Sequence, residues 1–151
     1  MKIKFLIPVL FIFLVQCGYE VVNQNKLNPY FVESFELNGD NRVNRIIKRN
    51  IQFYSKDNEE NTFNVKIKTK KSKNVLEKNI KNEIIKYQII ITSTVEFYNF
   101  KTSKTFKDIF VKQGELNVAN KTIDTRNNEK KLIESLVEDL SEDIIKKMRS
   151  I

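Results

Sequence analysis

The side chains that most often do chemistry in proteins are scarce in this sequence. Its 151 residues include one cysteine, Cys17, no histidine and three glycines. A serine–histidine–aspartate triad, cysteine–histidine catalysis, a histidine-containing zinc site and an internal disulfide are therefore excluded. Three scattered glycines also cannot form a glycine-rich nucleotide loop. We expect a protein that is not an enzyme and that holds no metal ion and no cofactor other than a covalent lipid.

The reason to expect a lipid is the place of Cys17. A basic start, Met1-Lys2-Ile3-Lys4, precedes an unbroken apolar run from Phe5 to Val15. A helix of that length spans about 16 Å, which is too short for a hydrocarbon core of about 30 Å. This pattern is the signature of a secretory signal peptide, which we predict for residues 1–16.

The end of that run resembles the bacterial lipobox, in which a signal peptidase cuts before a cysteine that receives diacylglycerol. The residues are Leu14-Val15-Gln16-Cys17, with Gln16 where a small residue is usual. The alternative is a free thiol, which would be a liability in an oxidising compartment. We predict lipidation of Cys17, with two or more acyl chains such as palmitate giving a stable membrane anchor. Gly18 in place of aspartate favours the outer membrane of a Gram-negative cell, on its periplasmic side.

Basic residues are the other candidates for binding. The formal net charge is +8, which attracts anionic lipid, acidic polysaccharide or nucleic acid alike; we expect no nucleic-acid partner. Arg42, Arg45 and Arg49 recur at helical spacing and account for three of five arginines. Lys66 and Lys68 share one face of a predicted strand. These residues are candidates to contact anionic lipid or an acidic partner, and the alternative for both sets is a solvated surface in a lysine-rich sequence.

Two other groups of residues are candidates for function. Glu138, Asp139, Glu142 and Asp143 could be a carboxylate pair for acid–base chemistry, but a solvated helix face explains them better. Aromatic residues near a predicted hairpin could insert into a partner or lipid, and of these we assign Phe97 to the core and leave Phe100 open.

Hydrophobic periodicity predicts the elements that position these residues. After a polar tether over residues 17–29, residues 30–151 are expected to form a single domain. Its predicted strands span 30–37, 63–68, 84–98 and 105–111, the last continuing to 118 with a bulge at Gly114. Its predicted helices span 43–54, capped near Asp40, and 127–148, and residues 70–82 are expected to form a charged connection.

This order predicts the fold class. A strand–helix–strand unit usually joins parallel neighbours, and the two later connections are typical of antiparallel hairpins. The long terminal helix must bury its apolar stripe on the sheet. The prediction is an α+β two-layer sandwich, with two helices packed on a four-stranded mixed sheet in the order β-α-β-β-β-α.

The sequence resembles the LptE family of lipopolysaccharide-assembly lipoproteins. The similar segments are Cys17-Gly18-Tyr19, the predicted hairpin from Phe97 to Phe110, and Asn128 to Leu136 continuing through Ile144-Ile145. The resemblance implies a partner and plug of the LptD β-barrel translocon that contacts lipopolysaccharide, and it transfers no site residue beyond Cys17. Two alternatives stay open: a periplasm-facing lipoprotein that is a non-catalytic carrier or scaffold for an anionic ligand, and a lipid-anchored hydrolase, which the missing motifs disfavour.

Overall fold

The structure, a computed structural model, describes residues 29–57 and 60–151. The predicted signal peptide, Cys17 and the tether up to residue 28 lie outside the described residues. The elements are β1 (Phe31–Gly39), α2 (Asn41–Phe53), β2 (Thr62–Lys78), β3 (Ile84–Asn99), β4 (Lys104–Asn117) and α3 (Thr122–Ser150). The predicted fold class and the order β-α-β-β-β-α are confirmed.

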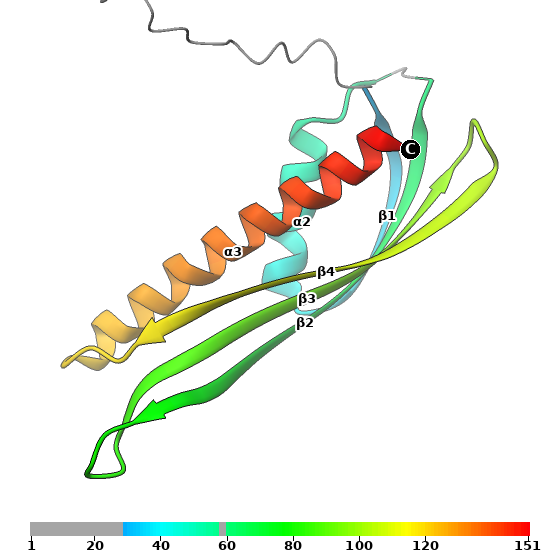
Figure 1. The fold of residues 1–151 in the computed structure, drawn as a ribbon. Coiled ribbons are helices and arrows are strands. Elements are labelled where there is room, and N and C mark those ends of the chain that lie inside the picture. Colours follow the sequence, from blue (N-terminus) through cyan, green and yellow to red (C-terminus); the bar gives the residue numbers. More distant parts are fainter. Residues whose placement is uncertain (1–28, 58–59) are drawn as a thin grey trace, which may run out of the picture.

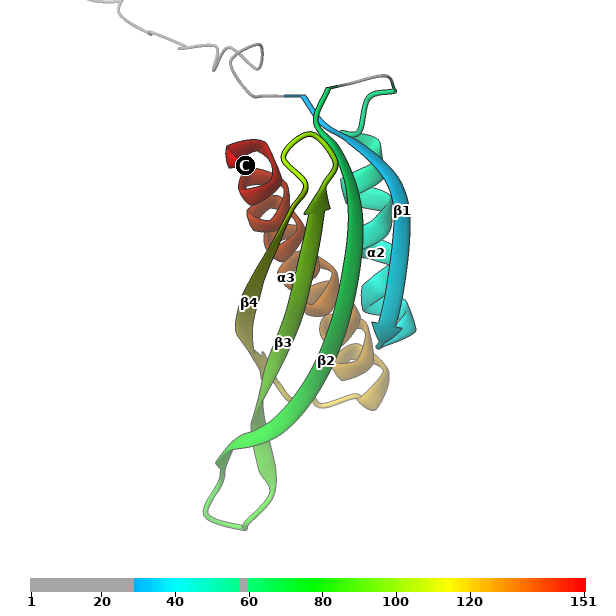
Figure 2. The same cartoon turned by 90° about the vertical axis from the view of Figure 1, so that its right-hand side faces the viewer.

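The four strands form one mixed sheet in the order β1-β2-β3-β4. β1 and β2 are parallel, whereas β2, β3 and β4 pair antiparallel, as predicted. Both helices cover the same face of the sheet, α2 behind β1 and β2 and α3 behind the later strands (Figures 1 and 2). The other face has no covering layer among the described residues. The molecule therefore has a helix-covered face and an open face.

The hydrophobic core lies between the helices and the helix-covered face. Alternating residues of the strands enter it, because successive side chains of a strand point to opposite faces. The helices contribute residues at intervals of three and four, the apolar stripe of an amphipathic helix. Its fully buried members include Phe63, Ile67, Ile89, Ile91, Val95 and Phe97 from the sheet, and Val43, Ile47, Ile51, Val137, Leu140 and Ile144 from the helices.

A polar junction fixes the crossover from β1 to β2 through α2. The Asp40 carboxylate accepts hydrogen bonds from the backbone N–H groups of Arg42 and Val43, both at 3.0 Å, which caps the helix. Buried Asn44 donates to the Asn38 carbonyl at 3.0 Å and accepts from the Thr69 hydroxyl at 2.8 Å. The cap predicted near Asp40 is thus confirmed, and it ties α2 to both parallel strands.

The charged connection predicted for residues 70–82 is wrong, because β2 continues to Lys78 and a short turn follows. Lysines can occupy helix-facing positions in this later part of β2 because their ammonium groups form ion pairs there. The Lys71 ammonium lies 3.3 Å from Asp40, and that of Lys73 lies 2.6 Å from Glu129. The β2–β3 hairpin consequently extends well past the end of β1 (Figures 1 and 2).

Two smaller predictions are also wrong. The pairing of β3 with β4 is regular through Gly114, without the predicted bulge. The glycine leaves room for α3, because a Cβ there would lie 2.8 Å from Leu132 Cδ1. In addition, α3 begins at Thr122 and not at residue 127; the Thr125 hydroxyl accepts from the Ala119 backbone N–H at 2.9 Å and stabilises this earlier turn.

Candidate functional site

The open face of the sheet carries a row of alternating charge. Glu36 on β1, Lys66 on β2, Glu96 on β3 and Lys107 on β4 are register partners, so they lie side by side across the four strands. The Lys66 ammonium lies 3.0 Å from Glu36, and that of Lys107 lies 2.8 Å from Glu96. The row is therefore internally paired.

The electrostatics of this row follow from that pairing. The hydrogen bond to Glu36 and its negative charge raise the pKa of Lys66. The hydrogen bond from Lys107 and its positive charge lower the pKa of Glu96. Each shift favours the charged form of its group, so Lys66 and Glu96 stay ionised at neutral pH. Because its two lysines pair with its two glutamates, the row presents little net charge to a ligand.

Lys68 lies one row further along β2, between its register partners Asn38 and Thr94. Across residues 29–57 and 60–151, no carboxylate lies within ion-pair distance of its ammonium. It borders a hollow of about 400 Å³ lined by Glu36, Asn38, Lys66, Lys68, Thr94, Glu96 and Lys107. The shared face predicted for Lys66 and Lys68 is confirmed, and of the two only Lys68 offers a cation without a carboxylate partner.

The three predicted arginines likewise differ in whether they have a carboxylate partner. The Arg42 guanidinium donates to Glu134 on α3 at 3.2 Å, so it joins the two helices. Arg45 and Arg49 are exposed, and neither has an ion-pair partner within the described part of the chain. Two of the three predicted arginines are therefore available to an external anion, while the contact between Arg42 and Glu134 spans 92 positions of sequence.

The structure does not bring the two basic sets together. Lys68 is on the open face of the sheet, whereas Arg45 and Arg49 are on α2 in the helical layer behind the opposite face (Figure 2). An anion bound by one set cannot touch the other. A partner that meets both sets must reach around the domain.

The turn between β2 and β3 was missed by sequence reasoning. The Asn79 side-chain oxygen accepts from the backbone N–H groups of Lys81 and Glu83, at 2.9 and 3.0 Å, and Asn82 has a φ of 62°. This turn holds Ile80 fully exposed, beside the exposed side chains of Val75, Leu76 and Ile85. The asparagines at 79 and 82 are the available signal, since asparagine favours such turns.

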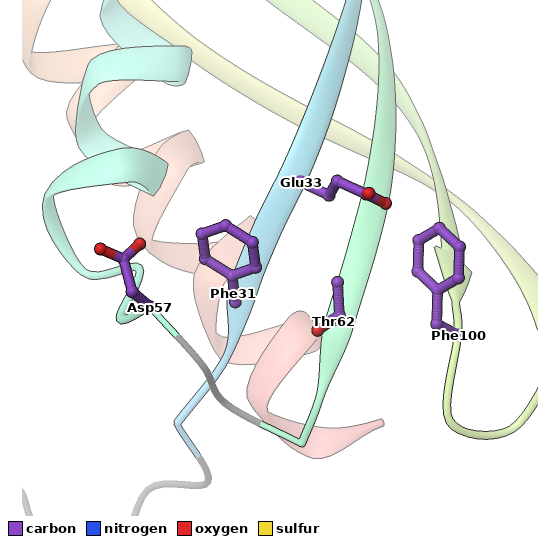
Figure 3. Close-up of a pocket in the computed structure, with 5 residues that line it drawn as sticks. All are labelled: Phe31, Glu33, Asp57, Thr62 and Phe100. Atoms are coloured by element: carbon purple, nitrogen blue, oxygen red, sulfur yellow. The ribbon is translucent and has the colours of Figure 1, made fainter.

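A second hollow lies at the opposite end of the sheet. Its volume is about 590 Å³, and its lining residues are Phe31, Glu33, Asp57, Thr62 and Phe100. Figure 3 shows the rings of Phe31 and Phe100 on the two sides of β2, and the Glu33 side chain extending from β1. Phe97 is fully buried and Phe100 is half exposed, so the core assignment of Phe97 is confirmed and Phe100 is at the surface.

The acidic residues of α3 behave as a solvated face. Asp143 lies 2.7 Å from Lys112 and 3.8 Å from Lys146, and Glu138 is exposed. Within the described ranges no group of histidine, cysteine, aspartate or glutamate side chains could hold a metal ion. The helices of this same part of the chain have no stretch long and apolar enough to cross a membrane.

Solved structures with a similar fold include bacterial lipoproteins. Rare lipoprotein B from Shewanella oneidensis aligns with a TM-score of 0.53 and 10% identity, over 78% of this chain and 94% of that chain. Uncharacterized lipoprotein B from Nitrosomonas europaea aligns with a TM-score of 0.63 and 9% identity, over 88% and 91%. No family model and no curated protein matches the sequence. The likeness is one of fold, and it agrees with the lipoprotein resemblance of the sequence.

Proposed function

We propose that this chain is an outer-membrane lipoprotein of the LptE type, a non-catalytic partner and plug of an LptD-type β-barrel in lipopolysaccharide assembly. The observation that carries the proposal is the coincidence of a lipobox-like Cys17 with a fold shared by bacterial lipoproteins. The fold alone does not choose a partner. The barrel follows from the resemblance of the sequence to the LptE family.

The distribution of basic groups supports an enclosing partner. Arg45 and Arg49 lie in the helical layer and Lys68 lies on the open sheet face, so a flat partner would contact one set only. A barrel that encloses the two faces of the domain, and leaves its ends uncovered, would meet both sets with one acidic wall. Contacts of arginine or lysine with carboxylate or phosphate are charge-assisted and stronger than neutral hydrogen bonds. The same groups suit the phosphates of lipopolysaccharide.

The test is affinity purification from membranes dissolved in mild detergent, using the full-length chain. We expect a large β-barrel in equal stoichiometry, together with lipopolysaccharide. A matched Cys17→Ala variant, made without the anchor, should remain uncleaved or become soluble in the periplasm, and it should recover less barrel. Recovery of the wild-type chain without a barrel would favour the alternative, a carrier or scaffold for an anionic ligand.

A further inference from the structure

The exposed large apolar side chains of the described residues separate by chemical type. Four are aromatic, namely Phe53, Tyr54, Tyr98 and Phe100. These lie at the end of α2 and around the β3–β4 turn, at the end of the molecule where β1 begins (Figure 1). The exposed aliphatic ones lie along β4 or toward the opposite end: Val75, Leu76, Ile80, Ile85, Ile109, Val111, Val118 and Ile123. We call the aromatic end, defined by these four residues, the tether end.

The rings of the tether end are held in place by contacts with one another and with α3. Phe53 and Tyr54 pack edge to face with centroids 5.1 Å apart, and Tyr98 and Phe100 do so at 5.0 Å. The Arg149 guanidinium lies 5.5 Å from the Tyr54 ring. Phe53 nevertheless remains 79% exposed and Phe100 43%. The fold thus presents aromatic surface outward at fixed positions.

The length of chain before β1 brings this end nearest to a lipid on Cys17. Pro29 lies twelve positions after Cys17, and a fully extended chain of twelve steps spans about 40 Å. α3 has 29 residues, so the domain continues for about another 43 Å along that helix. The tether end is therefore the part of the domain that lies nearest to the anchor, and the Ile80 turn lies at the opposite end.

We propose that the tether end docks on the phospholipid bilayer interface, with the rings of Phe53 and Phe100 entering the headgroup region. This inference rests on the proposed lipid anchor at Cys17. Tyrosine is enriched at the membrane–water interface, and phenylalanine is among the side chains that interfacial segments bury at the headgroup boundary. A second contact strengthens attachment beyond that of the acyl chains. The contact can be weak by itself, because the anchor raises its effective concentration. The exposed aliphatic side chains elsewhere stay away from the lipid.

Charge is not the basis of this contact. The cations of the tether end are Lys56, Lys101, Lys104 and Arg149. Lys101 is paired with Glu60, and the carboxylates Glu33 and Asp57 line the adjacent hollow. Opposite charges therefore largely offset each other at this end. Docking should occur on phosphatidylcholine, which is zwitterionic and has no net charge, and it should change little with added salt, unlike a contact built on charge alone.

The absence of tryptophan from the sequence allows a direct experiment. Single Phe53→Trp and Phe100→Trp variants, and an Ile80→Trp control at the far hairpin turn, would be prepared as the full acylated protein in phosphatidylcholine vesicles. All three positions are exposed, so each variant should fold. The measurement is tryptophan emission, with quenching by brominated phosphatidylcholine compared with quenching by a water-soluble quencher.

We expect the Phe53→Trp and Phe100→Trp proteins to shift their emission to the blue and to lose most of it to the brominated lipid. The Ile80→Trp protein should stay unshifted and respond only to the aqueous quencher. Acylated protein in which all three indoles remain in water, or in which only Ile80→Trp is quenched by lipid, would overturn the docking alone. Protein whose intact mass shows no acyl chain would overturn the anchor and the docking together.

Discussion

The two faces of the β-sheet differ in what they contribute to the molecule. On β2, Phe63, Val65 and Ile67 point to the helices and are buried, whereas the intervening residues Lys66 and Lys68 are exposed on the open face. The covered face thus holds the apolar surface whose burial stabilises the fold. The open face holds charges whose removal leaves that core intact. The difference teaches that the charges proposed for binding on this sheet lie apart from the apolar side chains that stabilise the fold.

The largest expected effect is on the covered face, in the stripe of α3. Leu140 is fully buried, so Leu140→Ala should lower the free energy of unfolding by about 2–5 kcal/mol, from lost burial and a residual cavity. Urea unfolding monitored by circular dichroism measures this. Ile123→Ala on the same helix is the control; its side chain is 58% exposed and should matter little. Equal, small effects of both changes would show that α3 is not docked.

The next-largest effect on stability is expected at the edge of the covered face, where β1 ends and α2 begins. Gly39 has a φ of +98°, and a Cβ there would lie 2.0 Å from the Thr69 carbonyl oxygen. Gly39→Ala should therefore destabilise the fold by about 1–3 kcal/mol through backbone strain. Gly114→Ala is the matched control and should cost less, because its Cβ would meet the movable Leu132 methyl group. A harmless Gly39→Ala would contradict the parallel junction of β1 with β2.

A smaller and pH-dependent effect belongs to the Asp40 cap. Burial tends to raise the pKa of this carboxyl, but hydrogen bonds from the Val43 and Arg42 backbone and the charge of Lys71 outweigh it and lower the pKa. A lowered folded-state pKa gives stability that is present above the unfolded value of about 3.9 and is lost as pH falls through the folded value.

Asp40→Asn separates the hydrogen bonding of this cap from the effect of its negative charge. Asparagine caps a helix about as well as aspartate, so this variant should lose less stability than the wild type between neutral pH and about pH 3. Asp40→Ala should cost about 0.5–2 kcal/mol at neutral pH. Urea unfolding at several pH values provides the measurement, and identical pH profiles of wild type and Asp40→Asn would refute the charge effect.

The smallest effect on stability is expected at the exposed cations. Arg45→Glu with Arg49→Glu keeps helix propensity nearly constant and should leave the unfolding midpoint unchanged, while it weakens salt-sensitive binding to lipopolysaccharide or the barrel. Lys68→Glu should do the same to a smaller extent. The control with equal charge change is Lys130→Glu with Lys131→Glu, on exposed positions of α3. Folded variants that bind as well as the wild type would assign Arg45, Arg49 and Lys68 to the solvated surface.

The sequence predicted those features of the fold that depend on periodicity. The stripe of α3, the alternation of β2 and the cap at Asp40 are local patterns, and the order of elements then limits the topology. The end of β2 was missed because Lys71 and Lys73 occupy inward positions that the pattern expects to be apolar. Their partners Asp40 and Glu129 lie on other elements, so no local pattern shows them.

The candidate site was predicted less completely for the same reason. Spacing placed Arg42, Arg45 and Arg49 together on one helical face, but it could not show that Glu134 pairs with Arg42. Nor could it show that the arginines and Lys68 end on opposite sides of the sheet. The aromatic tether end is likewise a product of topology, since its rings come from α2 and from the β3–β4 turn.

The most direct test of the proposed function is depletion of the chain in its native cell, followed by measurement of lipopolysaccharide at the cell surface. The account predicts that surface lipopolysaccharide falls on depletion. Expression of the wild-type chain should restore it, whereas Cys17→Ala should restore it poorly. Surface lipopolysaccharide that stays at its normal level while the chain is absent would contradict a role in its assembly.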